Sequence, residues 1–323
     1  MNISAFIKQI NEWGQAKVPF LFMVDFEMEN PLAIRLEDVD PQQIIFDING
    51  LTNFPSVASG DTIEITSRNP ISLEDYGKKF ERVHQHLRLG DSYLTNLTVK
   101  TEIQISHSLR NIFHQSKAKY RLLVDDKFLV FSPEIFIQIR DGKIFSYPMK
   151  GTIDAGIADA RELIVNDEKE LSEHVTIVDL IRNDLSLVST NVKVTRFRYL
   201  DELKTNHKNL LQVSSEIVGK LPVGYESKLG DILVQLLPAG SVSGAPKTKT
   251  VEIIREAEGE KRGYYTGVMG CFDGEKLDSC VMIRFIEDEN GKYFYRSGGG
   301  ITAQSVVEKE YQEAIDKVYV PVD

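Results

Sequence analysis

The chain has 323 residues, 42% of them hydrophobic, which is enough to build the core of one large domain or of two ordinary ones. Its net charge of −10 argues against nucleic-acid binding, because that affinity comes largely from Lys and Arg that neutralise phosphates. No apolar run is long enough to cross a membrane, and residues 1–17 lack the basic start and apolar run of a secretory signal. We therefore expect a cytoplasmic protein without membrane or nucleic-acid partners, in which Cys271 and Cys280 make no disulfide framework.

The first half of the chain predicts strands in hairpin-like order with a few helices between them. From Leu73, apolar residues spaced three and four apart predict a helix that ends at Gly90. Asp141-Gly142 between two apolar runs predicts a hairpin turn, because glycine tolerates the positive φ of a tight turn. The other stretches predict a short N-terminal helix, a helix near residues 109–119, and strands near 19–26, 43–48, 62–66, 92–105, 121–124, 127–131, 134–140 and 143–147.

This hairpin leads into Tyr147-Pro148-Met149-Lys150-Gly151-Thr152, which we expect to form a loop at the end of a strand. Proline restricts the backbone there, and glycine lets another group approach closely. Lys150 then has three interpretations: a nucleophile, an anion ligand or an ordinary solvated charge. The local sequence alone favours the solvated charge.

The second half predicts alternating helical and strand segments that end in a meander and a last helix. The expected helices cover residues 158–188, 228–237, 247–258 and 305–318, and the strands 192–198, 211–217, 265–272, 279–286 and 292–297. Hairpin-like strands with helices clustered between them indicate an α+β fold with mainly antiparallel sheets. No linker-like change in composition interrupts the chain, so we predict one domain over residues 1–323.

Two helices each carry a pair of glutamates one turn apart, Glu170 with Glu173 and Glu310 with Glu313. Oxygen-only ligands of this kind suit Mg²⁺, which binds through a few carboxylates, waters and an anionic substrate. Glutamates at this spacing are also usual on solvated helix faces, and the spacing alone favours that interpretation. Against it, each pair borders an apolar stripe of its helix.

Three further features could hold an anion. Residues 240–248 resemble a phosphate-binding loop, but the glycines are four apart rather than five, and Ala245-Pro246 separates the second from Lys247. Backbone N–H groups of this loop, or of Gly298-Gly299-Gly300, could still bind a carboxylate. Arg284 has apolar neighbours on its strand face and needs an anionic partner, so a structural salt bridge and a substrate carboxylate are equal alternatives.

Taken together, several segments resemble the chorismate-utilising enzymes, which include anthranilate, aminodeoxychorismate, isochorismate and salicylate synthases. Each segment alone is a weak signal, but the ordered set is specific. The segments are residues 90–97, 132–134, 148–152, 170–185, 240–247, 262–267, 278–284, 298–301 and 310–313. Residues 75–318 are therefore expected to be the catalytic core, and residues 1–74 match less clearly and resemble a shortened N-terminal part.

The resemblance implies one α+β domain with two large, packed antiparallel sheets and helices outside. It implies chemistry on chorismate with Mg²⁺ held by the four glutamates, Glu170, Glu173, Glu310 and Glu313, which reverses the interpretation that their spacing favours. The implied substrate contacts are Gly151, Thr152, Ser241, Tyr265, Arg284, Gly298, Gly299 and Gly300.

Within the family, Lys150 indicates which reaction to expect. Members similar to anthranilate synthase usually have alanine here, and those similar to aminodeoxychorismate synthase component I have lysine. The resemblance implies that Lys150 adds at C2 of chorismate while the C4 hydroxyl leaves with a proton from Glu134. Ammonia, normally supplied by a separate glutaminase subunit, then adds at C4 and expels the lysine, giving 4-amino-4-deoxychorismate for p-aminobenzoate and folate. Lys150 must be partly neutral for this, which desolvation or a nearby cation could achieve.

Two alternatives stay open: anthranilate synthase component I, and a non-catalytic subunit that docks a glutaminase. Leu94 stands where isochorismate synthase has a water-activating lysine, and leucine cannot activate water. Leu211 stands where many members have histidine; His207 is four positions away and receives no role. No segment matches the family's effector motif convincingly, so tryptophan binding is left open.

Overall fold

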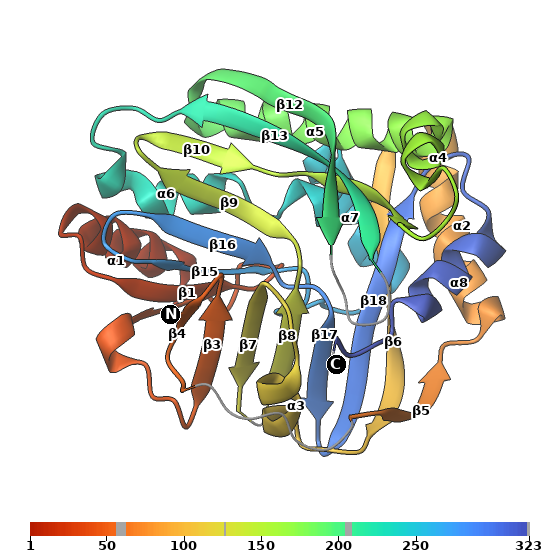
Figure 1. Ribbon diagram of the computed structural model, residues 1–323, viewed down its shortest axis with the longest axis horizontal. Coiled ribbons are helices and arrows are strands. Elements are labelled where there is room, and N and C mark those ends of the chain that lie inside the picture. Colours follow the sequence, from red (N-terminus) through yellow and green to blue (C-terminus); the bar gives the residue numbers. More distant parts are fainter. Residues whose placement is uncertain (56–62, 126, 204–208, 322–323) are drawn as a thin grey trace.

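The computed structural model describes residues 1–55, 63–125, 127–203 and 209–321. In this part of the chain two antiparallel sheets of nine strands each lie across one another, with helices on their outer faces (Figure 1). This arrangement confirms the predicted α+β class with two packed antiparallel sheets.

The first sheet carries the predicted 134–147 hairpin and its continuation. Its strands follow one another as β11 (Met149–Asp154), β13 (Leu210–Lys220), β10 (Lys143–Ser146), β9 (Ile135–Arg140), β16 (Leu277–Val281), β15 (Val268–Phe272), β1 (Phe20–Val24) and β2 (Leu32–Arg35), with β12 (Thr190–Leu203) also paired to β13.

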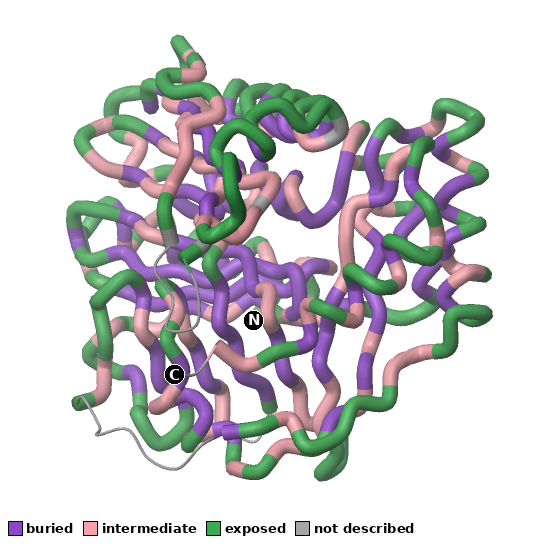
Figure 2. Tube along the Cα trace, turned by 45° about the vertical axis from the view of Figure 1, so that its right-hand side comes forward, coloured by how far each residue is buried: buried purple, intermediate pink, exposed green. Residues whose placement is uncertain are grey.

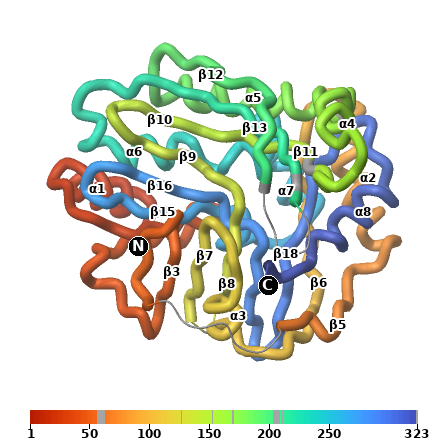
Figure 3. Tube along the Cα trace, in the orientation of Figure 1, coloured from red at the N-terminus to blue at the C-terminus, as the bar shows by residue number. Residues whose placement is uncertain are grey.

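The second sheet is built around a long strand from each half of the chain. Its order is β14 (Gly244–Ala245), β6 (Leu94–Ile105), β18 (Lys292–Ile301), β17 (Phe285–Glu289), β8 (Phe128–Ser132), β7 (Tyr120–Val124), β3 (Ile44–Ile48) and β4 (Leu51–Thr52), with β5 (Ile65–Pro70) also paired to β6. Figure 3 shows how C-terminal strands, in blue, lie beside N-terminal ones in both sheets: β15 beside β1, and β18 beside β6.

The inner faces of the two sheets form a shared apolar core. Met23, Met269 and Cys280 from the first sheet pack with Leu122 and Phe128 from the second, and all five are at most 4% exposed. Figure 2 shows that buried residues concentrate along the strands, whereas exposed ones follow the outer turns. Burial of this apolar surface is the main driving force for packing the sheets together.

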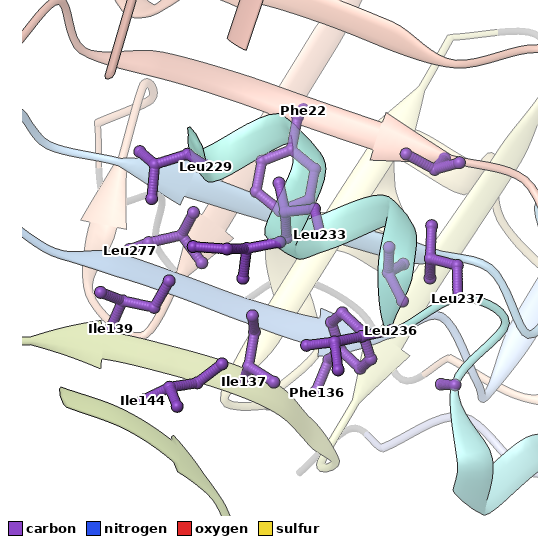
Figure 4. Close-up of a cluster of buried hydrophobic side chains, with 14 of the residues drawn as sticks. Phe22, Phe136, Ile137, Ile139, Ile144, Leu229, Leu233, Leu236, Leu237 and Leu277 are labelled. Atoms are coloured by element: carbon purple, nitrogen blue, oxygen red, sulfur yellow. The ribbon is translucent and has the colours of Figure 1, made fainter. Parts of the chain in front are cut away.

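Helices α1 (Ile3–Gln15), α6 (Leu229–Gln235) and α5 (Glu168–Val188) cover the outer face of the first sheet. Figure 4 shows Leu233 of α6 among side chains that rise from this sheet, including Phe22 and Ile139. The apolar stripe predicted along α5 is only partly buried: Val178 and Leu185 are in the core, but Leu171 and Val175 are exposed.

The second sheet is covered by helices α2 (Leu73–Leu89), α7 (Lys247–Glu258), α8 (Val307–Asp316) and α3 (Leu109–Gln115). Helix α4 (Ala160–Asn166) lies next to β11 and α5. The predicted helix from Leu73 is confirmed together with its ends. Ser72 Oγ accepts from the Asp75 N–H at 3.1 Å, and Gly90 ends the helix with φ 82°.

Two predictions about local structure were wrong, and a third strand is longer than predicted. Residues 279–286 are not one strand, because the chain leaves the first sheet after Val281 and enters the second at Phe285, with Arg284 between them at φ 54°. Residues 149–152 belong to β11 rather than to a loop. The strand predicted over residues 292–297 continues through Gly298-Gly299-Gly300, which pairs with β6 as part of β18. In each case pairing between distant strands decided the outcome, and local sequence does not encode such pairing.

No helix in the described ranges is long and apolar enough to span a membrane. Cys271 and Cys280 are both buried free thiols, as expected from their number.

Candidate active site

Lys150 lies on an irregularity in β11 that the local sequence explains. Pro148 has no N–H to donate, and its carbonyl accepts from Ser215 N at 3.0 Å. Pairing with β13 runs from Met149–Ser214 to Thr152–Gln212 with a shift of register between them. Gly151 supplies the positive φ, 82°, that this bulge requires. The bulge therefore takes Lys150 out of the regular ladder.

The amine of Lys150 meets the first glutamate pair. Lys150 Nζ lies 2.6 Å from Glu173 Oε2, and the Glu173 side chain is only 7% exposed. Burial lowers the pKa of Lys150, but the carboxylates of Glu173, Glu170 and Glu313 outweigh it, so the pKa is raised overall. Desolvation, one of the two means expected to make this lysine partly neutral, is thus outweighed by the carboxylates. A cation bound by the same carboxylates would remove their effect.

The second pair comes from α8 and also has a lysine on it. Lys317 Nζ donates to Glu313 Oε1 at 2.6 Å and to the Gly298 carbonyl at 2.8 Å. Glu310 is buried and accepts from Ser305 Oγ at 2.7 Å. The carboxylate of Glu313 helps to raise the pKa of Lys150, so the α8 glutamates lie within electrostatic reach of the lysine that contacts Glu173.

Two glycines leave room beside these carboxylates. A Cβ on Gly151 would lie 3.2 Å from Glu170 Oε2, and one on Gly299 would lie 3.3 Å from Glu313 Oε1. Gly298 has a different reason to be glycine, because its Cβ would lie 2.3 Å from the Leu97 carbonyl of the neighbouring strand. Of these three glycines, only Gly299 would direct a side chain toward the glutamates, so its missing side chain leaves room beside them.

The four glutamates fit a hard divalent cation by chemistry, although their present arrangement does not chelate one. Over the described residues, no group of three His, Cys, Asp or Glu side chains is placed to hold a metal ion. One glutamate of each pair contacts a lysine, Glu173 with Lys150 and Glu313 with Lys317. An all-oxygen donor set with bare backbone next to it is what Mg²⁺ with waters and an anionic substrate would use.

Glu134 lies directly before β9 and is held by the loop that precedes α7. Ser241, in the short 3₁₀ helix η3 (Gly240–Val242), donates a hydrogen bond to Glu134 Oε1. The structure thus places Ser241 against Glu134. Burial raises the pKa of Glu134, although Ser241, Arg284, Lys317 and Lys150 act in the opposite direction. A carboxyl group with a raised pKa is suited to carry a proton.

Arg284 contacts a tyrosine. Its Nε donates to the Tyr319 hydroxyl at 3.2 Å, and its guanidinium lies 5.2 Å from the centre of that ring. Among the described residues no carboxylate lies within 4.0 Å of it, so the structural salt bridge is absent there. The positive charge remains available to an anion, and it is close enough to lower the pKa of Glu134.

The other predicted positions are placed as follows. Tyr265 is buried edge-on against Phe285, and burial raises its pKa to about 12. The Thr152 backbone pairs with Gln212, but its side chain, like the whole of His207, lies outside the described part of the structure. Leu94 is buried, with its Cδ1 3.0 Å from where a Gly300 Cβ would be.

Leu211 is buried in β13 opposite Ile153, so an apolar side chain fills the position of the family histidine. The loop at residues 240–248 is no phosphate cradle: Lys247 Nζ binds Asp184 Oδ2 at 2.8 Å, and a Gly244 Cβ would lie 1.9 Å from the Leu94 carbonyl.

Sequence reasoning missed two residues next to the site. Lys317 follows Glu313 by four positions, directly after the last residue of α8, a spacing that could have indicated the contact. His174 is fully buried behind Glu173, and its Nε2 lies 2.7 Å from Ser215 Oγ. Burial, with Arg198 and Lys150 nearby, lowers the pKa of His174 to about 4, so the ring is neutral at neutral pH. No local signal separates it from an ordinary core histidine.

Comparison with known proteins assigns the family. The model of the chorismate binding enzyme family matches residues 7–323. The chain belongs to this family. The similar proteins of this family have different names. An "Uncharacterized PabA-like protein" of Haemophilus influenzae is 49% identical over 98% of this chain and 97% of its own length.

Two similar synthases are longer than this chain. Aminodeoxychorismate synthase component 1 of Bacillus subtilis is 31% identical over 83% of this chain, which corresponds to 60% of that protein. The crystal structure of anthranilate synthase component I from Streptococcus pneumoniae is 27% identical, with a TM-score of 0.67, and covers 79% of this chain and 59% of the other. These similarities establish the family and its fold. The names of the two synthases describe different reactions.

Proposed function

We propose that this protein is an aminodeoxychorismate synthase component I, which converts chorismate and ammonia into 4-amino-4-deoxychorismate. The observation that carries the proposal is the position of Lys150, with its amine at Glu173 and within electrostatic reach of Glu134. A solvated lysine on a strand end would lie in neither place. A lysine nucleophile and a carboxylic acid within electrostatic reach of each other are the groups that substitution at C4 requires.

Substrate binding falls to the charged and glycine positions around this space. Arg284 and the backbone beside Gly299 would bind the carboxylate of the pyruvyl ether, and Tyr265 would line the same side. Mg²⁺, bound by Glu170, Glu173, Glu310 and Glu313 directly or through water, would neutralise the ring carboxylate of chorismate. Glu173 would then bind the cation instead of Lys150, which would free the amine.

The chain's own residues then perform a substitution in two steps. The neutral amine of Lys150 adds at C2, the double bond shifts, and the C4 hydroxyl leaves as water with the proton of Glu134. Ammonia adds at C4, the double bond shifts back, and Lys150 leaves C2 as a neutral amine. Leu94 excludes water activation at the position that another member uses for it.

The ammonia source and the pathway are part of the proposal. A separate glutaminase would supply ammonia, and the product would serve p-aminobenzoate and folate synthesis. Anthranilate synthase is the second candidate, because a solved relative with that name is similar over 79% of this chain. The two reactions differ in the ring carbon that receives nitrogen and in the loss of pyruvate.

One product assay tests the proposal. The purified protein is incubated with chorismate, Mg²⁺ and ammonium, and the products are separated and identified by mass and fluorescence. We expect 4-amino-4-deoxychorismate without pyruvate release. Fluorescent anthranilate formed together with pyruvate would establish the second candidate instead. Unchanged chorismate would favour the non-catalytic, glutaminase-docking alternative.

A further inference from the structure

A small cavity shares Glu134 with the candidate active site. It has a volume of about 30 Å³ and lies between α5, the β9–β10 hairpin and residues 236–241. A water molecule needs roughly 10–15 Å³ of such space, so the cavity holds about two molecules of that size. Chorismate cannot fit in it. Neither Lys150 nor Glu173 belongs to its wall, so it is a separate space on the same acid.

The polar part of the wall consists mainly of hydrogen-bond acceptors. Glu134 Oε1 accepts from Ser241, and Asp184 Oδ2 accepts from Lys247 Nζ at 2.8 Å. Within the described chain, no donor is found for the second oxygen of either carboxylate, Glu134 Oε2 or Asp184 Oδ1. Ser146 donates its proton to the Phe136 carbonyl at 3.1 Å, which leaves its lone pairs. Ile181, Leu185 and Val281 make much of the remaining wall apolar.

This combination suits a small cation that donates hydrogen bonds. Burial raises the pKa of Asp184 against the effect of Lys247, and burial likewise raises the pKa of Glu134. Two partly desolvated carboxylates, each with one oxygen open to a further donor, favour a group that donates hydrogen bonds. Ammonium has the size of water, four N–H donors and a positive charge.

We propose that this cavity binds the ammonium ion that supplies the amination, between Glu134 and Asp184. The inference rests on the proposed function and adds to it the place from which nitrogen enters. It also completes the proton balance at Glu134. After Glu134 has given its proton to the leaving C4 hydroxyl, its carboxylate faces ammonium. Transfer of one proton from ammonium regenerates the acid and releases neutral ammonia, whose lone pair attacks C4. The sum is chorismate plus ammonium giving the protonated amine product plus water.

The first test removes the charge of one side chain in the cavity wall, Asp184. Asp184→Asn keeps the shape but removes the charge, whereas Asp179→Asn makes the same change at an exposed position of α5. Because hydrogen bonds to charged groups are among the stronger ones, we expect kcat/KM for ammonium to fall about tenfold or more in Asp184→Asn. The KM for chorismate should stay the same, and Asp179→Asn should behave like the parent. Equal effects on both substrates, or no effect on ammonium, would overturn the inference.

A second variant and a direct observation guard against misfolding as the cause. Ile181→Phe fills the cavity without removing a charge, and it should raise the KM for ammonium but not that for chorismate. Crystals soaked with thallium(I), which resembles ammonium in size and scatters anomalously, should show a peak between Glu134 and Asp184. Without such a peak the inference fails. A peak in a protein that forms no aminated product would instead refute the proposed function and leave the cation site standing.

Discussion

The two glutamate pairs look equivalent in sequence but are built differently in space. At α8, Glu313 binds Lys317, which lies four residues later and directly follows the helix, and both side chains are partly exposed. On α5, Glu173 binds Lys150, which comes from a different element, and the carboxylate is 7% exposed. The Glu313–Lys317 ion pair is therefore a local, solvent-screened contact. The Glu173–Lys150 ion pair, in contrast, exists only because the fold brings β11 to α5. We infer that the α8 side serves substrate binding in general and that the α5 side determines the reaction.

The largest expected effect is at Lys150. Lys150→Ala should lower the rate of C4 amination on the order of a thousandfold or more, because the covalent step loses its nucleophile. Chorismate affinity in the presence of Mg²⁺, followed by fluorescence titration, should change little. Lys150→Arg keeps the charge but cannot form the adduct, and it should be as inactive as the alanine variant. Near-normal turnover in either variant would remove the covalent mechanism.

The next effect is on the α8 glutamates. Glu310→Gln and Glu313→Gln should each weaken Mg²⁺-dependent chorismate binding by about 10–100-fold, the usual scale for ligands and their supporting groups at a metal site. Glu308→Gln is the control, since Glu308 is exposed on the same helix. Calorimetric titration of Mg²⁺ with a chorismate analogue measures this without turnover. If all three variants bound alike, the pair would be a solvated helix face after all.

Loss of the Ser241 hydroxyl should produce a smaller effect, mainly on the pH profile. The hydrogen bond from Ser241 lowers the pKa of Glu134, so Ser241→Ala should raise that pKa further. Glu134 acts in its protonated form, and activity is lost as pH rises through its pKa. The basic limb of the kcat profile should therefore move to higher pH, with a rate loss of about tenfold from poorer orientation of the acid. Ser241→Thr, which retains the hydroxyl, should restore the parent profile; an unshifted limb in Ser241→Ala would separate Ser241 from Glu134.

The same contrast explains what could be predicted from sequence. The helix from Leu73, the Asp141-Gly142 hairpin and the α+β class follow from periodicity, capping and turn chemistry, which are local. The family resemblance supplied the four glutamates and Lys150, whose positions the structure then brought together. The break at Arg284 and the pairing of Gly298 with β6 depend on which distant strands meet. So does the contact of Ser241 with Glu134, which lies 107 residues away. Side-chain patterns in a single chain do not specify those partners.

The smallest expected effect is at Lys317, and it distinguishes the role of this lysine from that of Lys150. Lys317→Met removes a contact between partly exposed groups, and pairs of this kind contribute little because solvent screens them. It also removes the hydrogen bond to the Gly298 carbonyl, so chorismate binding should weaken severalfold while the chemical step in single-turnover assays remains intact. Lys150→Met, made in parallel, should show the opposite pattern, with binding kept and the chemical step lost. If Lys317→Met abolished the chemical step as well, the α8 lysine would belong to the reacting centre, and the proposed division between a binding side and a reaction-determining side would be wrong.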